Sequence, residues 1–341
     1  MYIGLPPKRS WLKPSLGDSM TPNPVKLIVV SNPDIASLIQ GQALLKMGEW
    51  DEGPLVDGCA SHRLNDVRIW WLETGLLWED DLDKRWTSET GEEVSEVIFP
   101  SRHSAASGRP SLTVHPIGIP HLTEDDEIPF GGKAGECPPP NPRLGPWFRE
   151  IRKRGGDSSL SDEFSLTLET SHHGPWLETP CMFIEIGSTA EHWPRKDAAE
   201  ILAGIIWDGL GLGGGSGIGE WKSNSGEKVA VGLGGGHYAP FIGRLASYDG
   251  VWLGHMLAGY SLPMKKPASP DWDPLTGELP TGMWTHAIDS AISATRLAFP
   301  GAEVWAYMDR KSFKGWQRQA IRRYLESIGI PLGRTRDFVS L

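Results

Sequence analysis

The stretch Val25-Lys26-Leu27-Ile28-Val29-Val30-Ser31 determines the fold class of this chain. This apolar, β-branched run is typical of a buried strand, and after Asn32-Pro33 residues 34–47 have the periodicity of a helix. Further strands are expected at residues 66–73, 93–100, 111–115, 164–171, 181–187, 228–236 and 302–308. Further helices are expected at residues 146–154, 188–210 and 284–298, and a basic helix after residue 310. Strands that alternate with helices predict an α/β fold of three layers, in which a mixed, mostly parallel sheet carries helices on both faces.

The composition is that of a globular protein with long loops. Hydrophobic residues make up 39% of the 341 residues, with 41 glycines and 28 prolines, and no apolar run reaches the roughly 18 residues of a membrane span. Residues 1–24 lack the apolar segment of a signal peptide and are expected to form a flexible arm. Residues 25–341 are expected to form a single domain with loop insertions near residues 134–162, 209–227 and 262–282. Three cysteines without metal-type spacing (Cys59, Cys137 and Cys181) indicate a reducing compartment, and we expect a cytoplasmic protein.

A glycine-rich stretch, Gly234-Gly235-Gly236-His237-Tyr238, follows the strand expected at residues 228–236. Glycine allows positive φ and close approach of the backbone to a ligand. Consecutive glycines expose N–H groups that can hold an oxyanion or a phosphate, and here an imidazole follows them directly. A tight turn with an incidental histidine is the other interpretation of the same stretch.

Five of the ten histidines fall at the ends of expected strands. In an α/β sheet ligands bind beyond the carboxyl ends of the strands, so these imidazoles are expected to converge. Each can act as a general base, a proton donor or a zinc ligand, although their spacing does not demand a metal. Glu185 stands inside the apolar strand at residues 181–187, where a buried carboxylate needs a partner. The histidines are His103, His115, His172, His173 and His237.

The charge is unevenly distributed. A net charge of −10 argues against broad, non-specific binding of nucleic acid. Residues 310–323 nevertheless carry six basic side chains and no acidic one, and Lys314, Arg318 and Arg322 recur every four residues, as on one face of a helix. This stripe is either a solvated helix face or a local contact surface for phosphates.

Six short motifs occur in an order that resembles one family, the archaeal and plant type of D-aminoacyl-tRNA deacylase (the second deacylase family). The last of them is followed here by Phe241-Ile242, so polar contacts beyond it do not carry over. A basic ending, residues 309–315 with Arg318, is also similar to that of the family. The six motifs are Phe99-Pro100-Ser101-Arg102-His103-Ser104, Leu112-Thr113-Val114-His115, Gly131-Gly132-Lys133, His172-His173-Gly174-Pro175, Phe183-Ile184-Glu185-Ile186-Gly187-Ser188 and Gly234-Gly235-Gly236-His237-Tyr238-Ala239-Pro240.

The resemblance implies hydrolysis of the ester that joins a D-amino acid to the terminal ribose of tRNA. It also implies a zinc-containing monomer with a fold similar to nucleoside phosphorylases and peptidyl-tRNA hydrolase, and the acceptor end of tRNA as partner, with no membrane or DNA. A phosphorylase or hydrolase of small nucleosides, or an RNA-binding protein without catalysis, remain as alternatives.

The residue roles expected from this chemistry fall into three groups. His237 and His173 lie closest to the reacting ester, Glu185 orients them, and Gly235 and Gly236 offer N–H groups to the oxyanion. His103, His115 and His172 complete the pocket or bind its metal. The residues expected to bind substrate are Arg102, Lys133, Tyr238, Lys311, Lys314 and Arg318.

Overall fold

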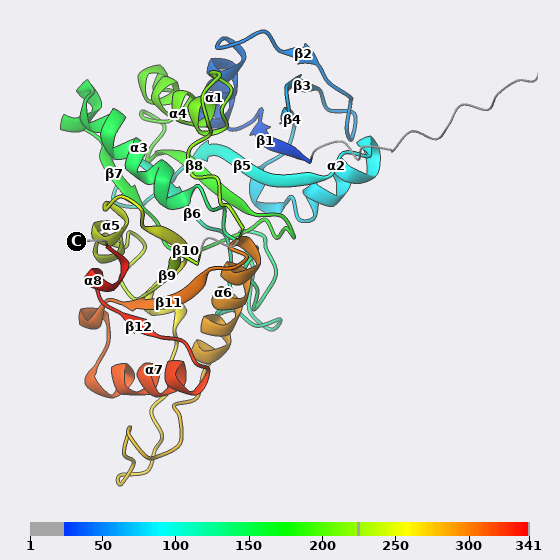
Figure 1. Ribbon diagram of the computed structural model, residues 1–341. Coiled ribbons are helices and arrows are strands. Elements are labelled where there is room, and N and C mark those ends of the chain that lie inside the picture. Colours follow the sequence, from blue (N-terminus) through cyan, green and yellow to red (C-terminus); the bar gives the residue numbers. More distant parts are fainter. Residues whose placement is uncertain (1–23, 224–225, 340–341) are drawn as a thin grey trace, which may run out of the picture.

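Two β-sheets organise residues 24–223 and 226–339, which the computed structural model of the protein describes. In Figure 1 the larger sheet occupies the upper part of the molecule and the smaller sheet the lower part. The arm expected at residues 1–24 lies almost wholly outside the described residues. No helix in the described part of the chain has the length and apolarity that a membrane span requires.

The larger sheet has eight strands. Their bounds are β1 (Val25–Ser31), β2 (Asp51–Glu52), β3 (Ser61–Leu64), β4 (Val67–Leu72), β5 (Val94–Arg102), β6 (Ser111–His115), β7 (Ser165–Leu168) and β8 (Cys181–Gly187). The strand order is β2-β3-β4-β1-β5-β8-β6-β7. Strand β1 is parallel to β4 and β5, β5 to β8, and β6 to β7, whereas β2–β3, β3–β4 and β6–β8 are antiparallel. The predicted mixed, mostly parallel sheet is thus confirmed.

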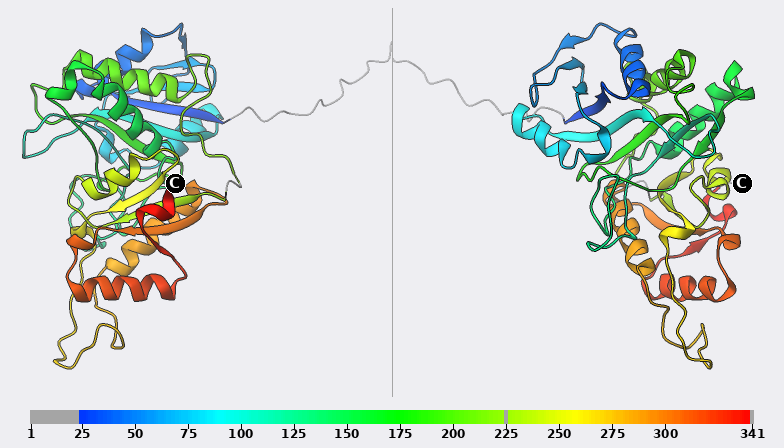
Figure 2. Two further views of the ribbon diagram at one scale, coloured as in Figure 1. Left: turned by 60° about the vertical axis from the view of Figure 1, so that its left-hand side comes forward. Right: turned by 180° about the vertical axis from the view of Figure 1, so that it is seen from behind.

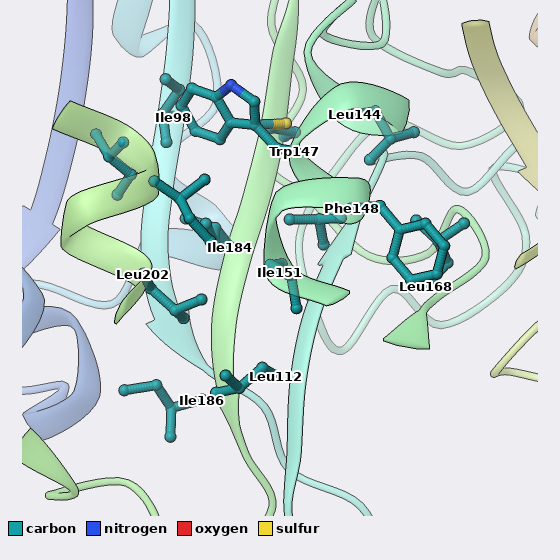
Figure 3. Packing of buried hydrophobic residues seen from close by; sticks show 14 of the residues in the cluster. Ile98, Leu112, Leu144, Trp147, Phe148, Ile151, Leu168, Ile184, Ile186 and Leu202 are labelled. Carbon is teal, nitrogen blue, oxygen red and sulfur yellow. The ribbon is translucent and has the colours of Figure 1, made fainter. Parts of the chain in front are cut away.

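Helices cover both faces of this sheet, as predicted. Ile28 and Val30 of β1 belong to the core under α1, α3 and α4, whereas Leu27 and Val29 pack with Trp86 of α2 on the other face. Figure 3 shows side chains of α3 and α4 against those of β5, β6 and β8. The helices around this sheet are α1 (Ile35–Leu45), the 3-10 helix η1 (Leu76–Trp78), α2 (Leu82–Thr90), α3 (Leu144–Gly156), the 3-10 helix η2 (Ser159–Asp162) and α4 (Lys196–Gly209).

The smaller sheet is entirely parallel, in the order β10-β9-β11-β12, with β9 (Lys228–Leu233), β10 (Trp252–Leu257), β11 (Glu303–Met308) and β12 (Leu332–Gly333). One face packs on α6 (Trp284–Ala298) and α7 (Gly315–Ser327). The other face joins the core of the larger sheet through α3 and α5 (Pro240–Ala246). Figure 2 shows the two sheets from two further sides. The remaining elements are η3 (Gly259–Ser261), η4 (Arg310–Ser312) and α8 (Thr335–Phe338).

One sequence-based boundary was wrong. Helix α4 begins at Lys196 and not at residue 188; the Ser188 hydroxyl donates a hydrogen bond to the Arg109 carbonyl and accepts none from a main-chain N–H of a described residue. The helix expected at residues 146–154 is confirmed as α3, a core helix whose Trp147 is fully buried. Residues 262–282, one of the expected insertions, follow η3 and form a loop that extends beyond α7 at the bottom of Figure 1.

Candidate active site

The five histidines expected to converge do so, together with two glutamates, at the junction of the two sheets. His237 follows β9 of the smaller sheet, and the other four histidines lie at strand ends of the larger one. Main-chain hydrogen bonds join the sheets here: Thr170 N–H donates to the His237 carbonyl (2.9 Å) and Ser171 N–H to the Met256 carbonyl (2.7 Å). The alternative of a non-catalytic protein with scattered histidines is therefore not supported.

His115, His172 and His173 form one group. The ring centroids of His172 lie 4.3 Å from His115 and 4.2 Å from His173. Strand β7 has ended before these residues, and His173 has a φ of 42°, in the left-handed region. The change in chain direction lets adjacent side chains face the same site.

The three imidazoles of this group share one hydrogen-bonding pattern. Each Nδ1 lies against a main-chain carbonyl: His115 against Pro116 (3.1 Å), His172 against Thr170 (2.7 Å) and His173 against Gly174 (2.6 Å). Because a carbonyl oxygen only accepts, each Nδ1 carries the proton, and a neutral ring such as that of His172 or His173 keeps its Nε2 lone pair.

His103, Glu169 and His237 form a second group. His237 Nε2 is 2.8 Å from Glu169 Oε2, and His103 Nδ1 is 3.2 Å from Glu169 Oε1. The other nitrogen of His103 lies 2.6 Å from the Tyr238 hydroxyl. The His237 side chain is 34% exposed, whereas Glu169 is fully buried.

Glu185 connects the two groups. Its Oε2 lies 3.4 Å from His115 Nε2 and 3.6 Å from His103 Nδ1. Burial alone would raise the pKa of Glu185, but the charges and hydrogen bonds of His115 and His103 hold it well below its ordinary value. Glu185 is therefore a carboxylate, as expected for a residue that orients imidazoles.

The pKa values of four of the imidazoles shift in two opposite directions. Burial, followed by the neighbouring imidazoles, lowers the pKa of His172 well below its ordinary value and that of His173 to about 3. Burial also acts to lower the pKa of His115 and His103, but Glu185 and Glu169 outweigh it, so both are raised. His172 and His173 are thus neutral near pH 7, the state that a metal ligand requires.

The donor set fits a zinc ion. The ligand atoms of His115, His172 and His173 lie within 4.8 Å of one another, and backbone carbonyls hold the opposite nitrogens, as around bound zinc. The buried Nε2 of His115 makes no hydrogen bond with a described residue, and the Glu185 carboxylate lies 3.4 Å from it. His103, expected among the metal ligands, lies with Glu169 and His237 in a second group of possible ligand atoms, and His173 joins His115 and His172.

The glycine-rich loop does not offer all the N–H groups that the sequence suggested. Gly234 N–H donates to the Leu257 carbonyl (2.7 Å) and Gly235 N–H to Ser312 Oγ (2.7 Å). Both have positive φ, 99° and 92°, which explains the need for glycine. Gly235 is therefore not supported as an oxyanion donor, whereas the N–H of Gly236 has no partner among the described residues.

A cavity of about 610 Å³ lies beside the two groups and is lined by members of both. His103, His172, His173, Glu185 and His237 line its floor, and Arg102 also lines it. The guanidinium of Arg102 lies 5.0 Å over the ring of Trp193 and forms no ion pair with a described residue. The volume of the cavity and the polar groups that converge on it are typical of a small-molecule site.

The cationic side chains predicted to bind substrate differ in their partners. Lys133 is partly neutralised, because its Nζ lies 2.7 Å from a Glu136 oxygen. Lys311 and Lys314 are exposed on η4 and at the start of α7, next to the Ser312 that holds Gly235. The guanidinium of Arg318 donates to the carbonyls of Arg310 and Phe313, so it also holds this turn in place.

The sequence interpretation missed Glu169. The criterion that selected Glu185, a carboxylate in an apolar strand, applies equally to Glu169, which follows Leu166 and Leu168. It directly follows β7, three residues before His172, so its position in the chain was a usable signal.

The comparisons with known proteins agree with one another. A family model of D-aminoacyl-tRNA deacylases matches residues 90–333. A D-aminoacyl-tRNA deacylase from Arabidopsis thaliana is 46% identical over 316 residues, which cover 92% of this chain and 99% of the relative. One from Methanosarcina barkeri is 29% identical over 319 residues, which cover 92% and 90%. A crystal structure of a conserved protein of unknown function matches with a TM-score of 0.71 and 25% identity, over 93% of this chain and 97% of that one.

Because the family model spans more than half of the chain and the Arabidopsis relative matches nearly all of it, the predicted family is confirmed. The chain belongs to the D-aminoacyl-tRNA deacylase family.

Proposed function

We propose that the cluster of histidines and glutamates is the site at which this deacylase hydrolyses the ester between a D-amino acid and the terminal ribose of tRNA. The observation that carries the proposal is the 2.8 Å contact between His237 Nε2 and the buried carboxylate of Glu169, beside the cavity floor. Ester hydrolysis needs a base for the attacking water, a donor for the oxyanion and a proton for the leaving oxygen.

His237 supplies the base. Its Nε2 faces Glu169, so its Nδ1 is left to take a proton from water as the water oxygen attacks the acyl carbon. The Glu169 carboxylate stabilises the imidazolium that forms, as the acid of a catalytic triad does. When the tetrahedral intermediate collapses, the imidazolium returns its proton to the departing ribose oxygen. The N–H of Gly236 is available to the oxyanion.

His115, His172 and His173 would hold zinc through their Nε2 atoms. Zinc bound there would supply a Lewis acid that polarises the ester carbonyl. Glu185 lies between the two groups and keeps the ring of His103 in place.

The acceptor stem of tRNA contacts the basic segment at residues 310–323 in this proposal. None of its six cations forms a salt bridge with a described residue, so their charges are available to phosphates. The hydrogen bond from Gly235 N–H to Ser312 Oγ ties this segment to the loop that carries His237. Phosphate contacts there would bring the 3′ end toward the cavity. Lys133, Arg102 and Tyr238 are further substrate contacts, closer to the ester.

The proposal describes a cytoplasmic monomer, in keeping with the free thiols of Cys59, Cys137 and Cys181. The decisive experiment is a deacylation assay on paired D- and L-tyrosyl-tRNA, with and without a zinc chelator. Release of D-tyrosine alone, lost on chelation, supports the proposal. Equal hydrolysis of both stereoisomers refutes the selectivity, and a reaction that needs inorganic phosphate supports the nucleoside phosphorylase alternative.

A further inference from the structure

The mouth of the cavity carries two aromatic rings that packing does not explain. Trp78 and Phe130 are each 58% exposed, and both line the same cavity as His173 and His237. Large aromatic side chains are usually buried, and exposed ones beside a binding site commonly contact the ligand.

The two rings are mounted on backbone that is fixed relative to the histidines. Trp78 ends η1, and Gly131, the residue after Phe130, packs so closely on this turn that a Cβ there would lie 1.7 Å from the Leu77 carbonyl oxygen. The Phe130 carbonyl accepts a 2.9 Å hydrogen bond from Gly174 N–H, directly after His173. The backbone segments that carry the two rings are therefore packed against the segment that carries His173.

We propose that Trp78 and Phe130 form a stacking platform for the unpaired 3′-terminal base of the tRNA. This inference rests on the proposed function and names the part of the substrate that the cavity mouth holds. The scissile ester is attached to the terminal ribose, so the terminal base must lie within one sugar of the reacting carbon. Single-stranded nucleic acid is held by aromatic rings on which its bases stack.

The distribution of charge in the cavity favours this assignment. The floor carries imidazoles and the carboxylate of Glu185, which suit the ester and the ammonium group of the amino acid. The mouth is apolar at Leu77, Trp78 and Phe130, and the unpaired cation of Arg102 lies at the same cavity. An aromatic surface with a neighbouring cation suits a base and its phosphate. The side chain of the amino acid, bonded next to the carbonyl, would lie deeper.

The test compares substrates that carry the base with one that lacks it. Trp78→Leu and Phe130→Leu keep an apolar side chain but remove the ring, and Trp78→Phe keeps a ring. We expect the leucine variants to raise KM for D-tyrosyl-tRNA, D-alanyl-tRNA and 3′-O-D-tyrosyl-adenosine by roughly 5- to 150-fold, the value of one stacked base. Hydrolysis of D-tyrosine methyl ester should stay unchanged, and Trp78→Phe should retain most of the affinity.

Tyr248→Ala serves as the control, because Tyr248 is 49% exposed but does not line this cavity. If the leucine variants weaken the methyl ester and D-tyrosyl-tRNA while sparing D-alanyl-tRNA, the rings hold the amino acid side chain and the platform is refuted. Unchanged KM for every substrate also refutes it. Failure of the proposed function would appear separately, as a wild-type protein that does not deacylate D-tyrosyl-tRNA.

Discussion

His237 Nε2 lies 2.8 Å from Glu169 Oε2, although the two residues belong to different sheets. Glu169 follows β7 of the larger sheet, and His237 follows β9 of the smaller one. The contact exists only because the loop that carries Tyr238 pairs with Glu169 in a short antiparallel bridge. The proposed base and its carboxylate are therefore products of the docking of the two sheets.

Replacing His237 with alanine should abolish deacylation without unfolding the protein. A positioned general base contributes about 10²- to 10⁴-fold to rate, and a side chain that is 34% exposed contributes little to the core. The rate of D-tyrosine release and the melting temperature measure the two effects. Unchanged turnover would remove His237 from the mechanism.

Glu169→Gln should lower kcat more than it raises KM. The substitution keeps the shape of the side chain but removes the charge that stabilises the imidazolium, so a loss of about 10²- to 10⁴-fold in kcat is expected. Single-turnover deacylation with saturating enzyme measures this step directly. A change confined to KM would show that Glu169 acts in substrate binding instead.

Local patterns predicted the strands that are buried on both faces. The bounds of β1, β6 and β8 agree with those predicted from the sequence, because an apolar run with β-branched residues is typical of a buried strand. The convergence of the histidines was also predicted, although the strands that carry them are not all parallel. Strand β6 is antiparallel to β8, and His115 reaches the site because it pairs with Phe183, two residues before Glu185.

The smaller sheet was only partly predicted. No strand was predicted at residues 252–257, where β10 contains Gly254; a Cβ at Gly254 would lie 2.4 Å from the Thr295 side chain of α6. The glycine is required by a packing contact distant in sequence. The division of the histidines into two groups depends likewise on the backbone turn at His173 and on tautomers set by carbonyls, neither of which has a signature in the spacing.

Removal of zinc should lower both activity and melting temperature. A ligand that binds only the folded state stabilises it, and the three imidazoles would lose their shared partner. Zinc content after purification, and melting curves with and without chelator, measure this independently of catalysis. His115→Ala should lose zinc, whereas His103→Ala should retain it; the opposite result would restore His103 as the ligand.

The protein should lose stability in acid partly through Glu96. Burial would raise the pKa of this carboxyl, but the charge and hydrogen bonds of Arg143 outweigh it, so the pKa is lowered on folding. A lowered pKa stabilises the fold above the unfolded value, about 4.3, and this contribution disappears as pH falls toward the folded value. Glu96→Gln should destabilise by about 3–5 kcal/mol at pH 7, and by less at pH 3 in urea unfolding. An equal loss at both pH values would contradict this.

The basic segment should determine the salt dependence of tRNA binding. Lys314 is exposed and forms no ion pair with a described residue, so its ammonium group is available to a phosphate. Lys314→Ala should raise KM for D-tyrosyl-tRNA and reduce the slope of log K against log salt by about 1, because one fewer counterion is released. Lys153→Ala, an exposed lysine on α3 of the other sheet, is the matched control. Arg318→Ala should raise KM for D-tyrosyl-tRNA more than Lys314→Ala does, and this difference should persist at high salt. Arg318 also holds the carbonyls of Arg310 and Phe313, and the loss of these hydrogen bonds is not screened by salt. If Lys314→Ala and Lys153→Ala have equal slopes, the helix face is merely solvated and the acceptor stem binds elsewhere.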